Sequence, residues 1–272
     1  MHNRYNIERR WRYNIRLELN YQIDGKKIRE SDPTLVLVNG LFADLTSFDG
    51  ASFYLKDQFE ILRYDCRGQG KSPKPDIVYT LEDHVLDLQE LLIKLDKKNI
   101  ILIGLSNGGR IALEYASRLP VHAVVACDTY DVISPLLKAK LGSWLRAHEE
   151  SGPLHRFDIA TPWIWGEETF ANKSELILSY RDQAGLTLDH VVKNLILGAL
   201  ETEIDVSLIK CPVLLIAGNE DLLTPVFYHE KMFSKLKNGK IKVVQSGHAS
   251  LIEKPMIMKE AILPWLLEQV SA

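Results

Sequence analysis

The sequence has few cysteines and no long uncharged apolar run. Its three cysteines, Cys66, Cys127 and Cys211, are scattered along the chain. An odd, sparse set without paired spacing argues against a disulfide framework and a zinc site, and favours reduced thiols. The charged N-terminus lacks the apolar stretch of about 7–15 residues that a signal peptide needs. No uncharged apolar run reaches the ~20 residues of a membrane span. We therefore predict a cytoplasmic protein without a membrane partner.

The sequence also lacks a large excess of charge of either sign. The 33 basic and 36 acidic residues give a formal net charge of −3, which does not suggest nucleic acid or an anionic membrane as partner. The 272 residues, 46% of them hydrophobic and 25% charged, are ordinary for a globular protein. This length suits one large α/β domain with an insertion. Composition leaves a homo-oligomer open.

Short, continuously apolar runs alternate with helical patterns along much of the chain. The runs are rich in β-branched residues, as strands covered on both faces are. Between two of them, apolar residues recur with helical spacing over 80–95, and Thr80 followed by Asp83 resembles a helix-start box. The alternation predicts an α/β fold with a mostly parallel sheet and helices on both faces. The predicted strands are 35–38, 61–64, 100–103, 123–126, 213–217 and 241–244.

Two segments depart from this alternation. Residues 15–23 alternate apolar and polar side chains and end at Asp24-Gly25, a hairpin-type turn signal, so we predict the first of two antiparallel edge strands there. Residues 131–204 contain successive helical patterns and no strand. We expect this insertion to be a helical cap over an active site, with the core domain formed by 1–130 and 205–272. A loosely packed surface excursion is the alternative. The aromatic residues of the insertion favour the cap because they need a surface to bury against.

The most informative motif is Gly104-Leu105-Ser106-Asn107-Gly108, which follows a predicted strand and opens a predicted helix. A serine in such a turn is held in a strained backbone conformation, and the flanking glycines relieve crowding. The helix N-terminus offers free N–H groups to developing negative charge. We therefore predict Ser106 as a nucleophile. The alternative is a serine that only caps the helix.

With this motif the sequence resembles the α/β-hydrolase family over nearly its whole length. The segments LVLVNGLFADLTSF, RYDCRGQGKSPKP, GLSNGG, PVLLIAGNEDLLTP and VVQSGHASLIEKP match five family motifs in family order. Asn39-Gly40-Leu41 is closer to the enol-lactonase-like and small esterase branches than to lipases. Many members have His-Gly where this chain has Asn39-Gly40, and asparagine can also hydrogen-bond nearby backbone. By position, the resemblance implies the amides of Asn107 and Leu41 as oxyanion donors, with Phe42 as the fallback for Leu41.

A serine nucleophile needs a neighbouring base and an acid that orients it. In this fold the chain order is serine, acid, histidine. His248 follows a strand-like run and a plausible acid loop, whereas His84 and His229 lie within helical patterns. We predict His248 as the base.

Asp221 follows the predicted strand 213–217 and is the predicted acid. Asp128 and Glu220 stay as competitors, because Asp128 also follows a strand and Glu220 adjoins Asp221. Asp65 and Arg67 are interpreted as residues that hold neighbouring loops.

The predicted chemistry is hydrolysis of a carboxylic ester or lactone through an acyl-enzyme. The same triad could serve a thioester or a carbon–carbon bond. From other classes, a non-hydrolytic lyase or oxygenase and a ligand-binding protein stay open. We expect a small-molecule substrate and, without a metal or dinucleotide motif, no cofactor. The candidate substrate pocket is formed by Phe42, Trp144, Trp163 and Trp165.

Overall fold

The computed structural model describes residues 17–271. Its strands form one seven-stranded sheet in the order β1-β3-β2-β4-β5-β6-β7. Neighbouring strands from β3 to β7 pair in parallel, whereas β1 pairs with β3 in the antiparallel direction. The strands are β1 (Tyr21–Asp24), β2 (Thr34–Val38), β3 (Ile61–Tyr64), β4 (Ile100–Leu105), β5 (Ala123–Cys127), β6 (Val213–Gly218) and β7 (Gly239–Val244).

The predicted hairpin at Asp24-Gly25 is wrong. The strand that follows this turn is β2, which is buried between β3 and β4, so it is not the neighbour of β1. Gly25 does occupy a turn conformation, with a φ of 65°. A turn signal indicates that the chain reverses but not which strand it pairs with. Part of the predicted strand, residues 15 and 16, lies outside the described residues.

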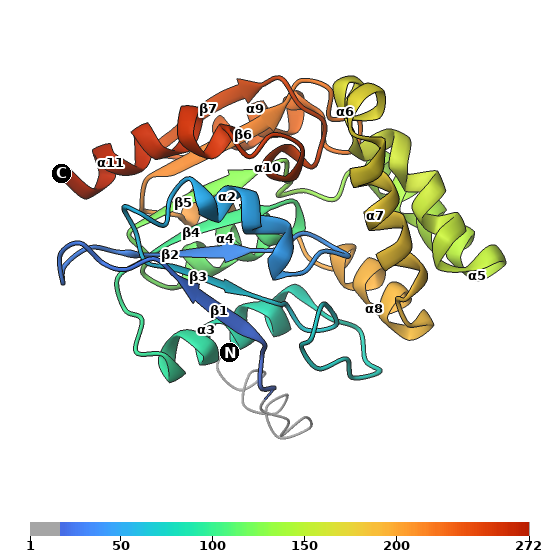
Figure 1. Cartoon of the computed structure of the whole chain (residues 1–272), viewed down its shortest axis with the longest axis horizontal. Coiled ribbons are helices and arrows are strands. Elements are labelled where there is room, and N and C mark those ends of the chain that lie inside the picture. The colour runs from blue at the N-terminus through green and yellow to red at the C-terminus, as the bar shows by residue number, and fades with distance from the viewer. Residues whose placement is uncertain (1–16, 272) are drawn as a thin grey trace.

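Helices cover both faces of the sheet (Figure 1). Successive residues of a strand point to opposite faces, and β2 follows this rule: Val36 and Val38 join one core cluster, whereas Leu35 and Leu37 join the other. One cluster also contains side chains of α3 (Leu81–Lys94), α4 (Asn107–Arg118) and α9 (Val226–Phe233). The other contains side chains of α2 (Asp49–Phe53), α10 (Ser250–Glu253) and α11 (Leu263–Ser271).

Helix α3 shows how local sequence defines an element. The Thr80 hydroxyl accepts a hydrogen bond from the Asp83 amide at 3.1 Å, and the Asp83 carboxylate accepts one from the Thr80 amide at 3.1 Å. This reciprocal capping box satisfies two of the free N–H groups at the helix start. The predicted start box is confirmed.

Between β5 and β6 the chain forms four consecutive helices, which lie together beyond one end of the sheet (Figure 1). We refer to residues 135–199 as the helical segment. Its longest helix is interrupted at Gly152, which has a φ of 82°, so that the chain turns before it resumes at Pro153. The helices are α5 (Pro135–Ile164), α6 (Glu167–Asn172), α7 (Ser174–Gly185) and α8 (Asp189–Ala199).

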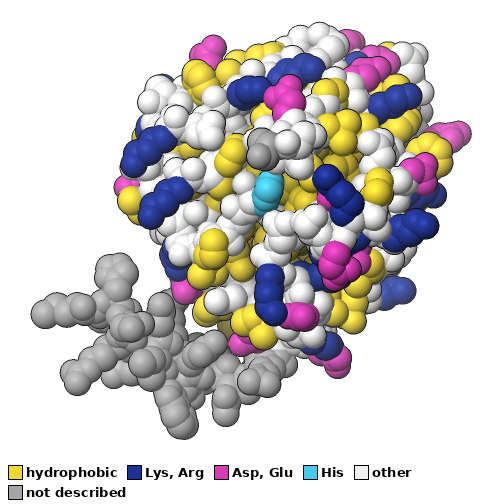
Figure 2. Space-filling view, turned by 90° about the vertical axis from the view of Figure 1, so that its left-hand side faces the viewer, with side chains coloured by type: hydrophobic (Ala, Val, Ile, Leu, Met, Phe, Trp, Pro, Cys, Tyr) yellow, Lys and Arg dark blue, Asp and Glu magenta, His cyan; other side chains and the backbone are white. Residues whose placement is uncertain are grey.

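The surface carries charges of both signs. On the face seen in Figure 2, basic and acidic side chains are interspersed with hydrophobic ones. Among the helices of residues 17–271, none combines the length and the apolar character that crossing a membrane requires.

Candidate active site

Ser106 lies at the turn from β4 to α4, with a φ of 56° and a ψ of −120°. This backbone conformation is rare for a residue with a side chain and indicates strain, as the sequence predicts. The flanking glycines permit it, because a Cβ on Gly108 would collide with the carbonyl oxygen of Val38, and one on Gly104 with the backbone of Gly108. The strand and helix can therefore approach closely enough to present Ser106 at the end of the sheet.

The structure brings the three predicted triad residues together in one hydrogen-bonded series. The Oγ of Ser106 lies 2.8 Å from Nε2 of His248, and Nδ1 of His248 lies 2.9 Å from Oδ2 of Asp221. The serine and the histidine are 142 positions apart in the chain. Such distances suit proton transfer from a hydroxyl to an imidazole that a carboxylate orients.

Local contacts hold Asp221 in place. One carboxylate oxygen accepts the backbone amides of Leu223 and Thr224, each at 2.8 Å. The other accepts the Thr224 hydroxyl at 2.8 Å as well as the bond to His248. The Thr224 hydroxyl also lies 3.1 Å from Nδ1 of His248. Thr224 therefore contacts both residues, a role that the sequence reasoning missed although the residue lies in the predicted acid loop.

The charges of this pair support each other. Burial opposes ionisation of both groups, but the His248 charge and hydrogen bonds hold the pKa of Asp221 below its usual value. In the same way, burial acts to lower the pKa of His248, and the Asp221 carboxylate outweighs it and raises that pKa above 6.5. The imidazolium that forms on proton transfer is thus stabilised by its neighbour.

Asp128, the competitor for the acid, is buried but makes no hydrogen bond to His248. Its carboxyl oxygens accept the amides of Gly218 at 2.9 Å and Ser250 at 3.2 Å. Burial, and then the negative charge of Asp221, raise the pKa of Asp128 to about 8. Through these two bonds Asp128 ties β6 to the loop after His248.

The other residues weighed for a role lie apart from this series. Glu220 accepts the backbone amide of Glu167 at 2.8 Å. Asp65 accepts the backbone amide of Leu45 at 2.7 Å, and Arg67 pairs with Asp87, so both hold neighbouring loops. His84 and His229 are buried within the core, and burial lowers their pKa values to about 3 and about 4. Burial also raises the pKa of the Cys66 thiol to about 12.

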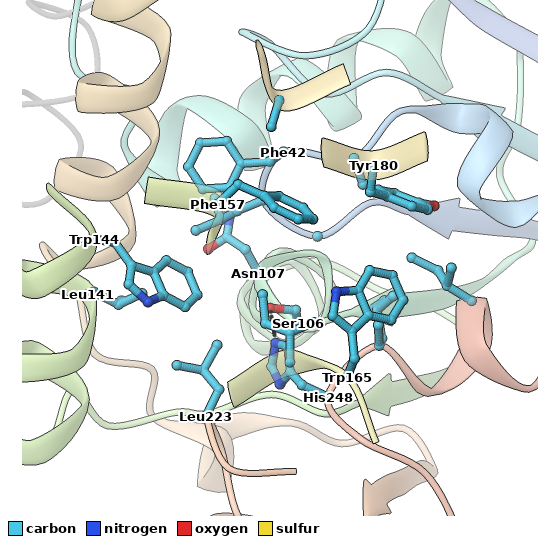
Figure 3. A pocket seen from close by; sticks show the side chains of 18 of the residues that line it. Phe42, Ser106, Asn107, Leu141, Trp144, Phe157, Trp165, Tyr180, Leu223 and His248 are labelled. Carbon is cyan, nitrogen blue, oxygen red and sulfur yellow. Dashed lines mark hydrogen bonds between the residues drawn. The ribbon is translucent and has the colours of Figure 1, made fainter. Parts of the chain in front are cut away.

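A cavity of about 90 Å³ opens above Ser106 and His248. Figure 3 shows Trp144 and Trp165 on either side of it, with Phe42 and Phe157 above. Its wall comes from the loop after β2, from the helical segment and from the histidine loop. The lining residues are Gly40, Leu41, Phe42, Ala43, Leu105, Ser106, Asn107, Tyr130, Leu137, Leu141, Trp144, Arg156, Phe157, Ile164, Trp165, Tyr180, Ala184, Leu223, His248, Ala249 and Ile252.

The loop after β2 approaches Ser106 closely. A Cβ built on Gly40 would lie 3.2 Å from Cβ of Ser106 and 3.2 Å from the carbonyl oxygen of Leu105. Leu41 and Asn107 line the cavity, where the predicted oxyanion donors would have to be. The side chain of Asn39 donates to the carbonyl of Tyr64 at 3.0 Å, which ties the loop to β3. Phe42 adopts a φ of 63°, so the backbone turns sharply within this loop.

Trp163 is placed differently from the prediction. It is not among the residues that line the cavity above Ser106. Its ring stacks on that of Trp144, with centroids 6.3 Å apart, and it borders an outer groove with Leu136 and Lys140. Trp163 and Trp165 flank the last residue of α5, so their side chains leave the backbone in different directions. Trp163 therefore supports Trp144 from behind.

Sequence reasoning also missed Arg156, Phe157 and Tyr180, which line the cavity from α5 and α7. Gly152-Pro153, a pair typical of a break in a helix, precedes Arg156 in the sequence. No local pattern, however, distinguishes these side chains from ordinary amphipathic helix residues.

Comparison with known proteins identifies the family. Residues 35–257 match the model of the alpha/beta hydrolase family. The chain belongs to this family.

Three individual relatives illustrate the match. A putative carbamate hydrolase, RutD, of Stutzerimonas stutzeri is 25% identical over 92% of this chain and 97% of its own. The 3-oxoadipate enol-lactonase 2 of Acinetobacter baylyi is 25% identical, over 90% and 91% respectively. A malate-bound thermophilic esterase from Thermogutta terrifontis superimposes with a TM-score of 0.84 and 26% identity, over 93% of this chain and 94% of that structure.

Proposed function

We propose that the chain is a serine hydrolase that cleaves a carboxylic ester or lactone through an acyl-enzyme. The observation that carries this proposal is the hydrogen-bonded series from Ser106 through His248 to Asp221 at the floor of a mainly apolar cavity. The names of two relatives, an enol-lactonase and an esterase, favour the same substrate class. A strained serine beside a base and a buried carboxylate has no evident use in a protein that only binds a ligand.

In the proposed reaction, His248 takes the proton of Ser106 while Oγ attacks the carbonyl carbon of the substrate. The amides of Asn107 and Leu41 would hold the oxyanion, and losing one such donor typically costs about 3–4 kcal/mol of transition-state stabilisation. His248 then gives its proton to the leaving oxygen. A water molecule, activated by the same imidazole, hydrolyses the acyl-enzyme and restores the serine.

We infer that the helical segment acts as the cap of this site. It contributes Trp144, Phe157 and Trp165 to the cavity wall. It is also fixed to the core beside the site, because the His248 amide donates to the Ile164 carbonyl at 2.6 Å. Helices in this position would exclude water from the reacting carbonyl and select the substrate by shape.

Labelling with a fluorophosphonate probe tests the nucleophile. Intact-mass measurement should show one added probe on the native protein and none on Ser106→Ala. Ser117→Ala, a serine change on α4, is the matched control and should be labelled like the native protein. Labelling of Ser106→Ala, or an unlabelled native protein, would contradict the assignment.

A substrate panel then tests the reaction class. Aryl esters and lactones of varied acyl length should be hydrolysed, and Ser106→Ala should lose that activity by several orders of magnitude. Faster turnover of thioesters or of carbon–carbon bonds would move the proposal to those substrates. Uniform inactivity together with absent labelling would favour a non-hydrolytic or ligand-binding role.

A further inference from the structure

Arg156 on α5 differs from the other buried arginines in the described part of the chain. The residue is 2% exposed, yet no hydrogen bond or ion pair joins its side chain to another described residue, and Nε and Nη2 lack an acceptor. Each of the other three donates to oxygen atoms. These are Arg63, which pairs with Asp24; Arg67, which pairs with Asp87; and Arg110, which donates to the carbonyl of Ala199.

An unpartnered buried cation is strongly unfavourable unless something outside the chain completes it. The acidic residue nearest in sequence, Asp158, is committed to Arg181 through two bonds of 2.7 and 2.9 Å. Burial lowers the pKa of Arg156 to about 10. The guanidinium therefore keeps its positive charge at neutral pH.

The position of Arg156 indicates where its partner would lie. It lines the same cavity as Ser106 and His248. Its guanidinium carbon lies 3.9 Å from the centroid of the Phe42 ring, beside the loop that carries Leu41. Stacking uses the flat face of a guanidinium and leaves the N–H groups at its edge free to donate.

The rest of the cavity wall complements a negative charge. No aspartate or glutamate within residues 17–271 lines it, and the indole Nε1 atoms of Trp144 and Trp165 are also without acceptors. The buried side-chain nitrogen and oxygen atoms of the lining that lack a partner are thus all hydrogen-bond donors, and one group among them is cationic. An occupant that brings acceptor oxygens to Arg156 would supply the partner that the chain does not.

We propose that the cavity takes an ester or lactone that also carries a free carboxylate, which Arg156 binds. This inference rests on the proposed function and names its substrate class. A planar guanidinium matches the two oxygens of a carboxylate in a paired, charge-assisted geometry. Arg156 is the permanently charged side chain among the described residues that line the cavity, which matches one monoanionic group.

Paired aryl esters test this proposal in two arms. The first compares a monoaryl glutarate, acidic in its acyl part, with its neutral methyl ester. The second compares a carboxyphenyl butyrate, acidic in its alcohol part, with phenyl butyrate. In at least one arm the native protein should favour the acidic member in kcat/KM. The arm with the preference identifies the end of the substrate that Arg156 contacts.

Variants link the preference to this side chain. Arg156→Gln should lower the acidic-to-neutral ratio of kcat/KM by a factor between about 10 and 100, because a charge-assisted bond is lost. Arg156→Lys keeps the positive charge but not the planar guanidinium that can donate two parallel hydrogen bonds. Its ratio should lie between those of the native protein and Arg156→Gln. Arg146→Gln is the matched control: Arg146 is exposed on the same helix, so the ratio should not change.

Binding gives a readout that does not depend on turnover. Calorimetry with Ser106→Ala should detect glutarate binding, weakened by a similar factor when Arg156→Gln is added. The proposal would be overturned by a native preference for the neutral ester in both arms, or by equal losses of kcat/KM for both members of a pair in Arg156→Gln. Hydrolysis of the neutral esters would in that case still support the proposed function. Failure of the function itself would appear instead as absent labelling of Ser106 and no hydrolysis of any ester. Glutarate binding would then still decide the role of Arg156.

Discussion

At the end of the sheet, the polar side chains of the candidate triad have partners within the chain. In contrast, donor atoms of Arg156, Trp144 and Trp165, which line the cavity, have no acceptor among the described residues. Asp221 accepts hydrogen bonds at both oxygens, and Asp128 does the same at its own site. Arg156 and the indole of Trp144 have no acceptor among the described residues. The contrast suggests a division of labour, because a closed network keeps reacting groups aligned and open donors recognise what enters.

The largest effect should come from the acid within the closed network. Asp221→Asn should lower kcat by about 10⁴-fold, because the amide cannot hold His248 in the required tautomer. Asp128→Asn should cost less than about tenfold, since Asp128 does not contact the imidazole. Steady-state kinetics on one aryl ester would compare them. The reverse order would assign the role of the acid to Asp128.

The next effect concerns pH. His248 must be neutral to accept a proton, and its pKa is raised above 6.5 by Asp221. Activity should therefore fall as the pH drops through that raised pKa, by roughly tenfold per pH unit once below it. In Asp221→Asn the carboxylate that raises the pKa is gone, so the acidic limb of the residual activity should shift to lower pH. A profile of kcat/KM against pH measures both, and an unshifted limb would assign the titration to another group.

The smallest effect concerns the break in α5. Gly152 has a φ of 82° and a ψ of −173°, so Gly152→Ala should lower the free energy of unfolding by about 1–3 kcal/mol through backbone strain. Gly142→Ala, in the regular part of the same helix, should instead raise it by about 0.5–1 kcal/mol. Urea unfolding would detect the opposite signs. Equal changes would mean that the direction of α5 does not depend on Gly152.

Much of the fold could be predicted because the buried strands are coded locally. Runs such as 100–103 are apolar at every position, and the structure extends that strand only to Leu105. The partner of β1 could not be predicted, since pairing depends on where β3 lies in space. The helical segment was predicted as helices, but the helix that follows the break at Gly152 and the short helix α6 were not. Pro153 and Pro162 lie in that stretch, and proline disfavours a helix interior.

The candidate site divides in the same way. Ser106 and His248 follow strands, and the ends of parallel strands meet at one edge, so their proximity was predictable. The roles of Thr224 and Arg156 could not be predicted, because they depend on contacts with residues distant in the sequence. A buried arginine without a partner looks, in sequence, like any polar residue on an amphipathic helix. Its burial and its lack of a partner can be seen only once the positions of the surrounding side chains are known.

The hydrogen bond between the His248 amide and the Ile164 carbonyl joins the base to the last residue of α5. A rearrangement that lifts this helix end to admit a substrate would also release the backbone of the histidine. Substrate entry and the backbone position of the base would then be coupled through this one bond.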